Sequence, residues 1–404
     1  MTGISVPVTL PAEQTGRRRR AAVRFAQFST EYLIALPLAC VIALVWANTD
    51  PESYFTFAHN WAFTVNQVLI VFLFGILTKQ VVEATLPNGS LHTFRRAALP
   101  CMAGIGGLIV PIVIYILFLN YWGEFPLREA WVTSCAVDIA AVYLVTRSIF
   151  GRHPAVPFVL LAAISANAIG VVLIAFFHPV GKGYYAMAAG LMALALATSY
   201  SLQRAKVRNF WPYLIAGGSL SWAAFYVGGI QPALALVPIV PFMPRMSSSA
   251  GLFADMPAGA HDTLTEFERF WRGPLQLILF LFGLVNAGVP LHGQEPGFWA
   301  LPMATIVGRP IGVVLAVGLG VLAGMHRPTQ IGWRDLIVIG FATSVGLSMA
   351  LFFATSALPI GSLLVQAKLG SLLTAGGALV ALLAAVFLGV GRIGRLTRPR
   401  KARP

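Results

Sequence analysis

The chain has 404 residues, of which 57% are hydrophobic and only 10% are charged, and its formal net charge is +14. Because about 25% of the residues in an average soluble domain are charged, this composition excludes a soluble fold, a disordered chain, a disulfide scaffold and a nucleic-acid-binding domain. A membrane protein with many spans remains, since one span needs about 20 mostly apolar residues.

Apolar segments follow one another along the whole chain, and they predict an all-α integral membrane protein with about 12 transmembrane helices. A short Gly217-Gly218-Ser219 patch separates segments seven and eight. Three parts are predicted: a basic N-terminal tail (1–30), a transmembrane domain (31–390) and a basic C-terminal tail (391–404). The segments lie near 31–48, 63–78, 97–119, 131–149, 155–177, 184–202, 211–220, 222–242, 273–291, 300–323, 336–356 and 364–390.

Lysines and arginines are distributed unevenly between the two sides of these segments. With both termini in the cytoplasm, the inside stretches hold 24 of the 28 basic residues, and the outside loops hold Arg128 and Lys182. This positive-inside pattern predicts cytoplasmic termini. The arginines at 17–20 before an apolar run resemble a signal peptide, but the run from Tyr32 to Trp46 is long for one, which favours a retained first span.

The three cysteines and the common motifs give no sign of an enzyme. Cys40, Cys101 and Cys135 lie inside apolar runs without the spacing of a metal site, so we expect them to pack as small hydrophobic residues. The sequence contains no nucleotide loop, zinc motif or catalytic triad, and no cofactor is expected.

Ionisable side chains at membrane depth cost a few kcal/mol each, so each is a candidate for function. Of the 14 acidic residues, Asp138 alone lies well inside a segment; Arg309 lies in segment ten, and Lys368 near the start of segment twelve. Asn167 and Ser165 lie in segment five. Structural alternatives are an ion pair of Asp138 with Arg309, a snorkelling Arg309, interhelical hydrogen bonds from Asn167 and Ser165, and a structural Lys368.

Small and polar residues interrupt two of the segments. They precede Asp138 in segment four, and segment eleven contains Ser344, Gly346 and Ser348 within six residues. Interrupted membrane helices free backbone groups, and the dipoles of the half-helices can then help to coordinate ions near the midplane. We therefore predict two broken helices at corresponding places of the two halves.

With these residues in view, the chain resembles the NhaA family of bacterial sodium/proton antiporters over about residues 31–390. Each motif alone is weak evidence for the family, but the order and spacing of the motifs together are specific to it. The motifs are Gly89-Ser90-Leu91, Arg95 to Pro100, Gly106 to Pro111, Arg128 to Trp131, Ala136 to Ala140, Asn286 to Val289, Gly308 to Gly312 and Ala367 to Gly370.

The resemblance implies a fold and a setting for the chain. The family fold is an inverted repeat in which the fourth and eleventh helices are broken and cross. It further implies a place in the bacterial inner membrane, exchange of Na⁺ for H⁺, and a part in pH homeostasis. Many members form homodimers, and this sequence carries no sign for or against one.

The chain departs from the family pattern at the positions that carry its chemistry. The family has two consecutive aspartates in span five, which carry the sodium and the protons; this chain has Asn167 and Ala168 there. The family lysine of span ten is Arg309. Three further differences are Leu77 for a glutamate in span two, Val137 for a threonine in span four and Gln231 for a histidine in span eight.

Asp138 is therefore the one remaining group able to hold a proton and a cation in turn, and three hypotheses follow. In the first, an antiporter binds Na⁺ transiently at Asp138, Asn167 and Ser165 with backbone oxygens of span eleven, and one carboxylate supports electroneutral exchange. In the second, a proton-coupled transporter holds an anion at Arg309. In the third, Asp138 and Arg309 form a fixed pair in a protein that does not transport. Arg309 and Lys368 are the candidates for gating or charge compensation.

The family also senses pH through charged groups on the cytoplasmic face. The segment 243–272, which contains several acids and a histidine, is the best candidate for a pH-responsive element. The alternative for each charged residue is a solvated loop position. The candidates are Glu83, Asp255, His261, Asp262, Glu266, Glu268 and Arg272.

Overall fold

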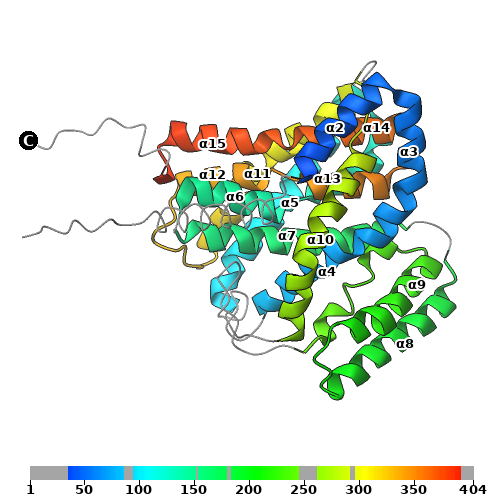
Figure 1. Ribbon diagram of the computed structural model, residues 1–404. Helices are drawn as coiled ribbons and strands as arrows, with labels where there is room; N and C mark the ends of the chain where they lie inside the picture. The colour runs from blue at the N-terminus through cyan, green and yellow to red at the C-terminus, as the bar shows by residue number, and fades with distance from the viewer. Residues whose placement is uncertain are drawn as a thin grey trace, which may run out of the picture.

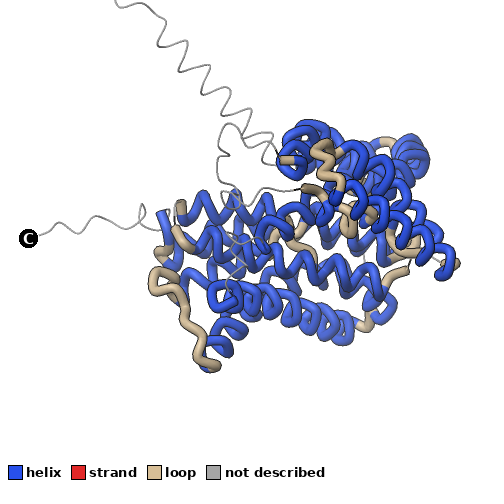
Figure 2. The backbone as a smooth tube through the Cα atoms, turned by 90° about the horizontal axis from the view of Figure 1, so that it is seen from below, coloured by secondary structure: helices blue, strands red, loops and turns tan. Residues whose placement is uncertain are grey.

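The computed structural model describes residues 35–85, 94–151, 153–179, 183–244, 262–291 and 296–392. Within these ranges the chain is helical and contains no strand, as Figure 2 shows. The predicted tail 1–30 and all but two residues of the tail 391–404 lie outside the described residues. Lys182, Asp255 and His261 lie outside them too.

Most of the helices follow the apolar segments along the chain, and a further helix covers residues 51–63, between the first two predicted segments. Short 3₁₀ and π stretches (η) mark the places where the regular α-helix is interrupted. In chain order they are α2 (Ala35–Thr49), α3 (Pro51–Phe63), η1 (Thr64–Leu69), α4 (Val71–Thr85), α5 (Phe94–Trp122), η2 (Phe125–Cys135), α6 (Ile139–Phe150), α7 (Ala155–Phe177), α8 (Tyr185–Arg204), η3 (Tyr213–Gly218), α9 (Ser219–Gly228), η4 (Pro232–Leu234), η5 (Val240–Phe242), α10 (Thr263–Asn286), η6 (Pro296–Trp299), α11 (Ala300–Leu322), α12 (Trp333–Thr343), α13 (Leu347–Ala357), α14 (Ser362–Leu373) and α15 (Gly376–Leu388).

Among the described residues, six helices are long and apolar enough to cross a membrane, and the number rises to eight if each of two bent helix pairs is one span. The bent pairs are η2 with α6, at 60°, and α12 with α13, at 51°. The prediction of broken helices in segments four and eleven is therefore confirmed in its location. The other four predicted spans fall on α2, on η3 with the start of α9, on the rest of α9 with η4 and η5, and on α10. None of these passes the same test of length and apolarity.

The predicted boundary between segments seven and eight is wrong. The chain stays helical through Gly217, Gly218 and Ser219, because η3 continues directly into α9. The turn comes later, at Gly229, whose φ of 69° is in the left-handed region that glycine adopts freely. Gly217 instead serves close packing, since a side chain there would collide with the Ser199 hydroxyl of α8.

The helices separate into groups that Figure 1 makes visible. One group is built around α5, which packs against α11 and α7, while α12 packs against α11 and α15. A second contains α10, which packs against α2 and α3. The helices α8 and α9 lie side by side at the lower right of Figure 1 and also pack against η3. Both broken helices belong to the first group.

Glycine allows α5 and α11 to approach until their backbones touch. A Cβ atom on Gly312 would collide with the carbonyl oxygen of Gly106, and one on Gly106 would collide with the Gly312 carbonyl oxygen. Small residues permit such contact between membrane helices, where packing rather than the hydrophobic effect holds helices together. This contact fixes the position of α11, which carries Arg309.

We expect Gly312→Ala to destabilise the fold, because the added methyl group meets backbone rather than a movable side chain. Overpacking of this kind costs about 1–3 kcal/mol or more. Gly318→Ala on the same helix is the matched control, since the nearest atom to its Cβ would be 3.9 Å away, on Trp333. Thermal unfolding in detergent should show a lower midpoint for Gly312→Ala alone, and equal midpoints would contradict the close contact.

Candidate functional site

The two helix breaks lie against each other. Between η2 and α6 the chain is extended at Ala136 and Asp138, and the Asp138 N–H donates to the carbonyl oxygen of Val345 in the other break, at 2.9 Å. Gly346 lies so close to the first break that a Cβ on it would be 2.7 Å from the Ala136 oxygen. The backbone groups freed by one break are therefore partly satisfied by the other, as the apolar surroundings require.

The Asp138 carboxylate receives donors from both breaks. Its Oδ1 accepts from the Ala141 N–H at 3.5 Å, in the first turn of α6. Its Oδ2 accepts from the Ser348 hydroxyl at 2.8 Å and from the Ser348 N–H at 3.4 Å, in the first turn of α13. Only 5% of the residue is exposed. The negative charge thus faces two helix N-termini, whose dipoles stabilise an anion.

Arg309 lies at the C-terminal end of a half-helix, η2, whereas Asp138 lies at helix N-termini. Its Nη2 donates to the carbonyl oxygens of Ser134 at 2.9 Å and Ala136 at 2.5 Å, at the C-terminal end of η2. The side chain is 1% exposed, and its Nε has no hydrogen-bond partner among the described residues. A cation is favoured at a helix C-terminus. In the described part of the chain no ion pair joins Arg309 to Asp138, so the geometry of the predicted structural pair is not observed.

Asn167 holds the extended backbone beside the carboxylate. Its Oδ1 accepts from the Val137 N–H at 3.1 Å, and its Nδ2 donates to the Val137 carbonyl oxygen at 2.7 Å. Both polar ends of the amide are therefore occupied by one residue of the break. Ser165, by contrast, donates to the Leu161 carbonyl oxygen in its own helix and lies 3.2 Å from the sulfur of Cys101 on α5.

The other predicted site residues are placed as follows. The Ser344 hydroxyl donates to the Phe341 carbonyl oxygen at 2.6 Å, which closes the end of α12. Lys368 lies on α14, which packs against α13 and η2, and no hydrogen bond or ion pair joins it to another described residue. Ser348 was predicted as part of an interrupted helix, but its contact with the carboxylate was not foreseen. The ion-binding and gating roles stay predictions.

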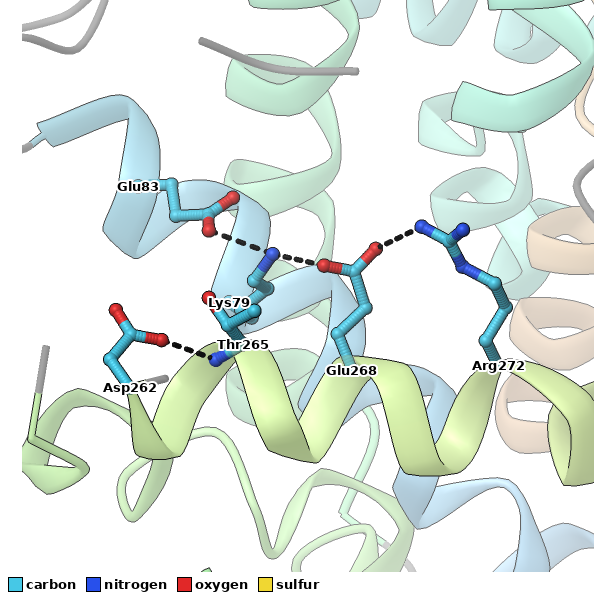
Figure 3. A network of polar contacts seen from close by, with 6 residues as sticks. All are labelled: Lys79, Glu83, Asp262, Thr265, Glu268 and Arg272. Carbon is cyan, nitrogen blue, oxygen red and sulfur yellow. Dashed lines mark hydrogen bonds and ion pairs between the residues drawn. The ribbon is translucent and has the colours of Figure 1, made fainter. Parts of the chain in front are cut away.

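Four of the predicted pH candidates gather at one end of α4 and α10, as Figure 3 shows. Lys79 forms ion pairs with Glu83, at 2.7 Å, and with Glu268, and Arg272 pairs with Glu268 at 3.0 Å. Asp262 accepts from the N–H of Thr265 at 2.7 Å and so caps α10. The central cation, Lys79, was missed by the sequence prediction. Its i,i+4 spacing to Glu83 was the available signal.

In the described part of the chain, no group of three or more His, Cys, Asp or Glu residues could hold a metal ion. Asp138 lies at the meeting of the two breaks, and the Lys79 cluster lies apart from it, between α4 and α10.

We expect Lys79→Met to destabilise the protein more than Arg272→Met. Lys79 is 3% exposed, and its loss leaves Glu83 without its cation and Glu268 with Arg272 alone, which costs about 3 kcal/mol for a buried pair. The Arg272 side chain is 49% exposed, so its loss costs about 1 kcal/mol at most. Thermal unfolding in detergent compares the two variants, and equal losses would contradict the central role of Lys79.

Comparison with known proteins identifies the family of the chain. The family model described as Na⁺/H⁺ antiporter 1 matches residues 23–388. The proteins named Na(+)/H(+) antiporter NhaA of Desulfitobacterium hafniense and Geobacter sulfurreducens are 38% and 34% identical over 376 and 373 residues. These alignments cover 91% and 90% of this chain, and 96% and 97% of the relatives. Na(+)/H(+) antiporter NhaA 1 of Pelobacter propionicus is 35% identical over 377 residues, which cover 90% of this chain and 97% of that protein. The chain belongs to the Na⁺/H⁺ antiporter 1 family.

Proposed function

We propose that this protein is a secondary transporter that exchanges Na⁺ for H⁺ at Asp138. The observation that carries the proposal is a buried carboxylate at the meeting point of two helix breaks, held by donors from both. The relatives named as Na(+)/H(+) antiporters support the choice of ions.

The proposed membrane arrangement has twelve spans, with both termini on the cytoplasmic side of a bacterial inner membrane. The distribution of basic residues supports it, since 24 of 28 fall on one side of the predicted segments. In this arrangement η2 with α6 is the fourth span and α12 with α13 is the eleventh. The two would cross at the Asp138–Val345 backbone contact, as in an inverted repeat.

Exchange at one carboxylate follows from its two states. The ionised form binds a hard cation through oxygen, and protonation removes the charge that holds the cation. Asn167 and Arg309 support this chemistry by position. The amide fixes Val137 next to the carboxylate, and the guanidinium occupies the carbonyl oxygens of Ser134 and Ala136.

A stoichiometry of one Na⁺ for one H⁺ follows from the same residues. Neither Asn167 nor Ala168 can carry a proton in exchange for a cation, and a guanidinium keeps its charge at any accessible pH. Asp138 is then the one carboxylate among these site residues, so each cycle moves one proton against one Na⁺. Such an exchange transfers no net charge and does not respond to the membrane potential.

We expect a Na⁺ pulse to drive proton efflux from proteoliposomes that contain the wild-type protein, and Asp138→Asn to reduce this flux to that of empty vesicles. The neutral amide cannot alternate between a proton and a cation. Glu52→Gln is the matched control, because Glu52 lies exposed in the first turn of α3. An intact flux in Asp138→Asn would show that the site lies elsewhere.

The same vesicles test the stoichiometry. With a membrane potential imposed by valinomycin and a K⁺ gradient, the initial rate of exchange should stay within the error of the rate at zero potential. A rate that rises with the potential would contradict one-for-one exchange.

Two other outcomes would replace the proposal. Proton-driven anion uptake that is lost in Arg309→Ala would indicate anion transport. The absence of flux of any ion in a folded preparation would indicate a protein that does not transport.

A further inference from the structure

We propose that Ser348 is a direct ligand of the transported Na⁺, which its hydroxyl oxygen binds beside the Asp138 carboxylate. The inference rests on the proposed exchange at Asp138. The Ser348 hydroxyl donates to Asp138 Oδ2 at 2.8 Å, and Ser348 is 5% exposed. Among the described residues it is the one side chain with a hydrogen bond to this carboxylate.

A hydroxyl can serve both states of an exchanging site. It carries one proton and two lone pairs, and it rotates about its C–O bond. Without a cation, the proton points to the carboxylate and stabilises its charge. With Na⁺ present, rotation turns a lone pair toward the ion, and the Ser348 and Asp138 oxygens, which are hydrogen-bonded neighbours, become two ligands of one hard cation.

The carboxylate stays in place when the hydroxyl turns away. The Ser348 N–H, at 3.4 Å, and the Ala141 N–H, at 3.5 Å, hold its two oxygens from the two breaks. These donors belong to the backbone at two helix N-termini and do not rotate. The hydroxyl is therefore the one contact of the carboxylate that can change without displacing it.

Three other hydroxyl groups near the breaks donate to backbone oxygens, and the buried Ser134 hydroxyl has no hydrogen-bond partner among the described residues. Those of Thr343 and Ser344 donate to the Gly340 and Phe341 carbonyl oxygens of their own helix. Ser165 donates to Leu161 in the same way. Such bonds to a preceding turn satisfy the hydroxyl proton locally. Ser348 differs, because its proton goes to an ionisable side chain of another helix.

Sodium-driven proton flux in proteoliposomes, measured across Na⁺ concentrations at one pH, tests the assignment. Ser348→Ala should raise the KM for Na⁺ about tenfold and leave the maximal rate within about twofold, because Asp138 remains. Ser348→Thr keeps the hydroxyl and should restore the wild-type KM. Ser348→Cys keeps the volume with a poor ligand for a hard cation, and should behave as Ser348→Ala does. Thr355→Ala, on the same helix, is the matched control and should keep the wild-type KM, because the Thr355 hydroxyl donates only to the Leu351 and Phe352 carbonyl oxygens of α13.

The outcomes separate this inference from the function on which it rests. Absence of Na⁺-driven flux in the wild-type protein would overturn both the exchange function and the assignment of Ser348 as a Na⁺ ligand. Normal wild-type flux with an unchanged KM in Ser348→Ala and Ser348→Cys would overturn only the assignment of Ser348 as a ligand. An equal rise in KM for Ser348→Thr and Ser348→Ala would also overturn it, because the position would then matter for packing rather than for its oxygen.

Discussion

A helix that is interrupted inside a bilayer must satisfy the backbone groups that it frees, and in this protein one interruption satisfies the other. The Asp138 N–H reaches the Val345 oxygen, and Gly346 lets the two breaks touch. Unpaired peptide groups in apolar surroundings cost several kcal/mol each, so neither break is expected to persist without its partner. The position of the carboxylate depends on this mutual support.

The charges of the site follow the same geometry. Asp138 lies at the N-termini of α6 and α13, and Arg309 lies at the C-terminal end of η2. Each charge is therefore opposed by backbone dipoles instead of by the other charge. A carboxylate without a cationic partner is free to exchange a proton for Na⁺, whereas a direct pair with Arg309 would have to be broken in every cycle.

Part of this arrangement was predictable from the sequence. Asp138 was identifiable as the one acid deep in a segment, and Gly346 with its polar neighbours marked the second break. The partner of Arg309 was not predictable, because backbone carbonyl groups carry no signature in a sequence.

Two features outside the site were predicted wrongly or missed. Gly217 to Ser219 looked like a loop, yet the glycines there serve contact between helices. Hydrophobic periodicity cannot distinguish these two uses of glycine. Lys79 was missed because its partner Glu268 is distant in the chain and meets it only through the packing of α4 on α10.

Asn167 shows what an amide does at one of the two positions where the family resemblance implies aspartates. Its amide donates to the Val137 carbonyl oxygen and accepts from the Val137 N–H. An ionised carboxylate can only accept, so an aspartate at this position could not hold the carbonyl oxygen in the same way. The Asn167 amide thus cannot titrate, but it fixes the backbone of Val137 beside Asp138. With no acid at position 167 or 168, Arg309 has backbone oxygens as its partners, and its permanent charge is not required to titrate. The contacts of Asp138, Asn167 and Arg309 are therefore consistent with the proposed exchange at one carboxylate.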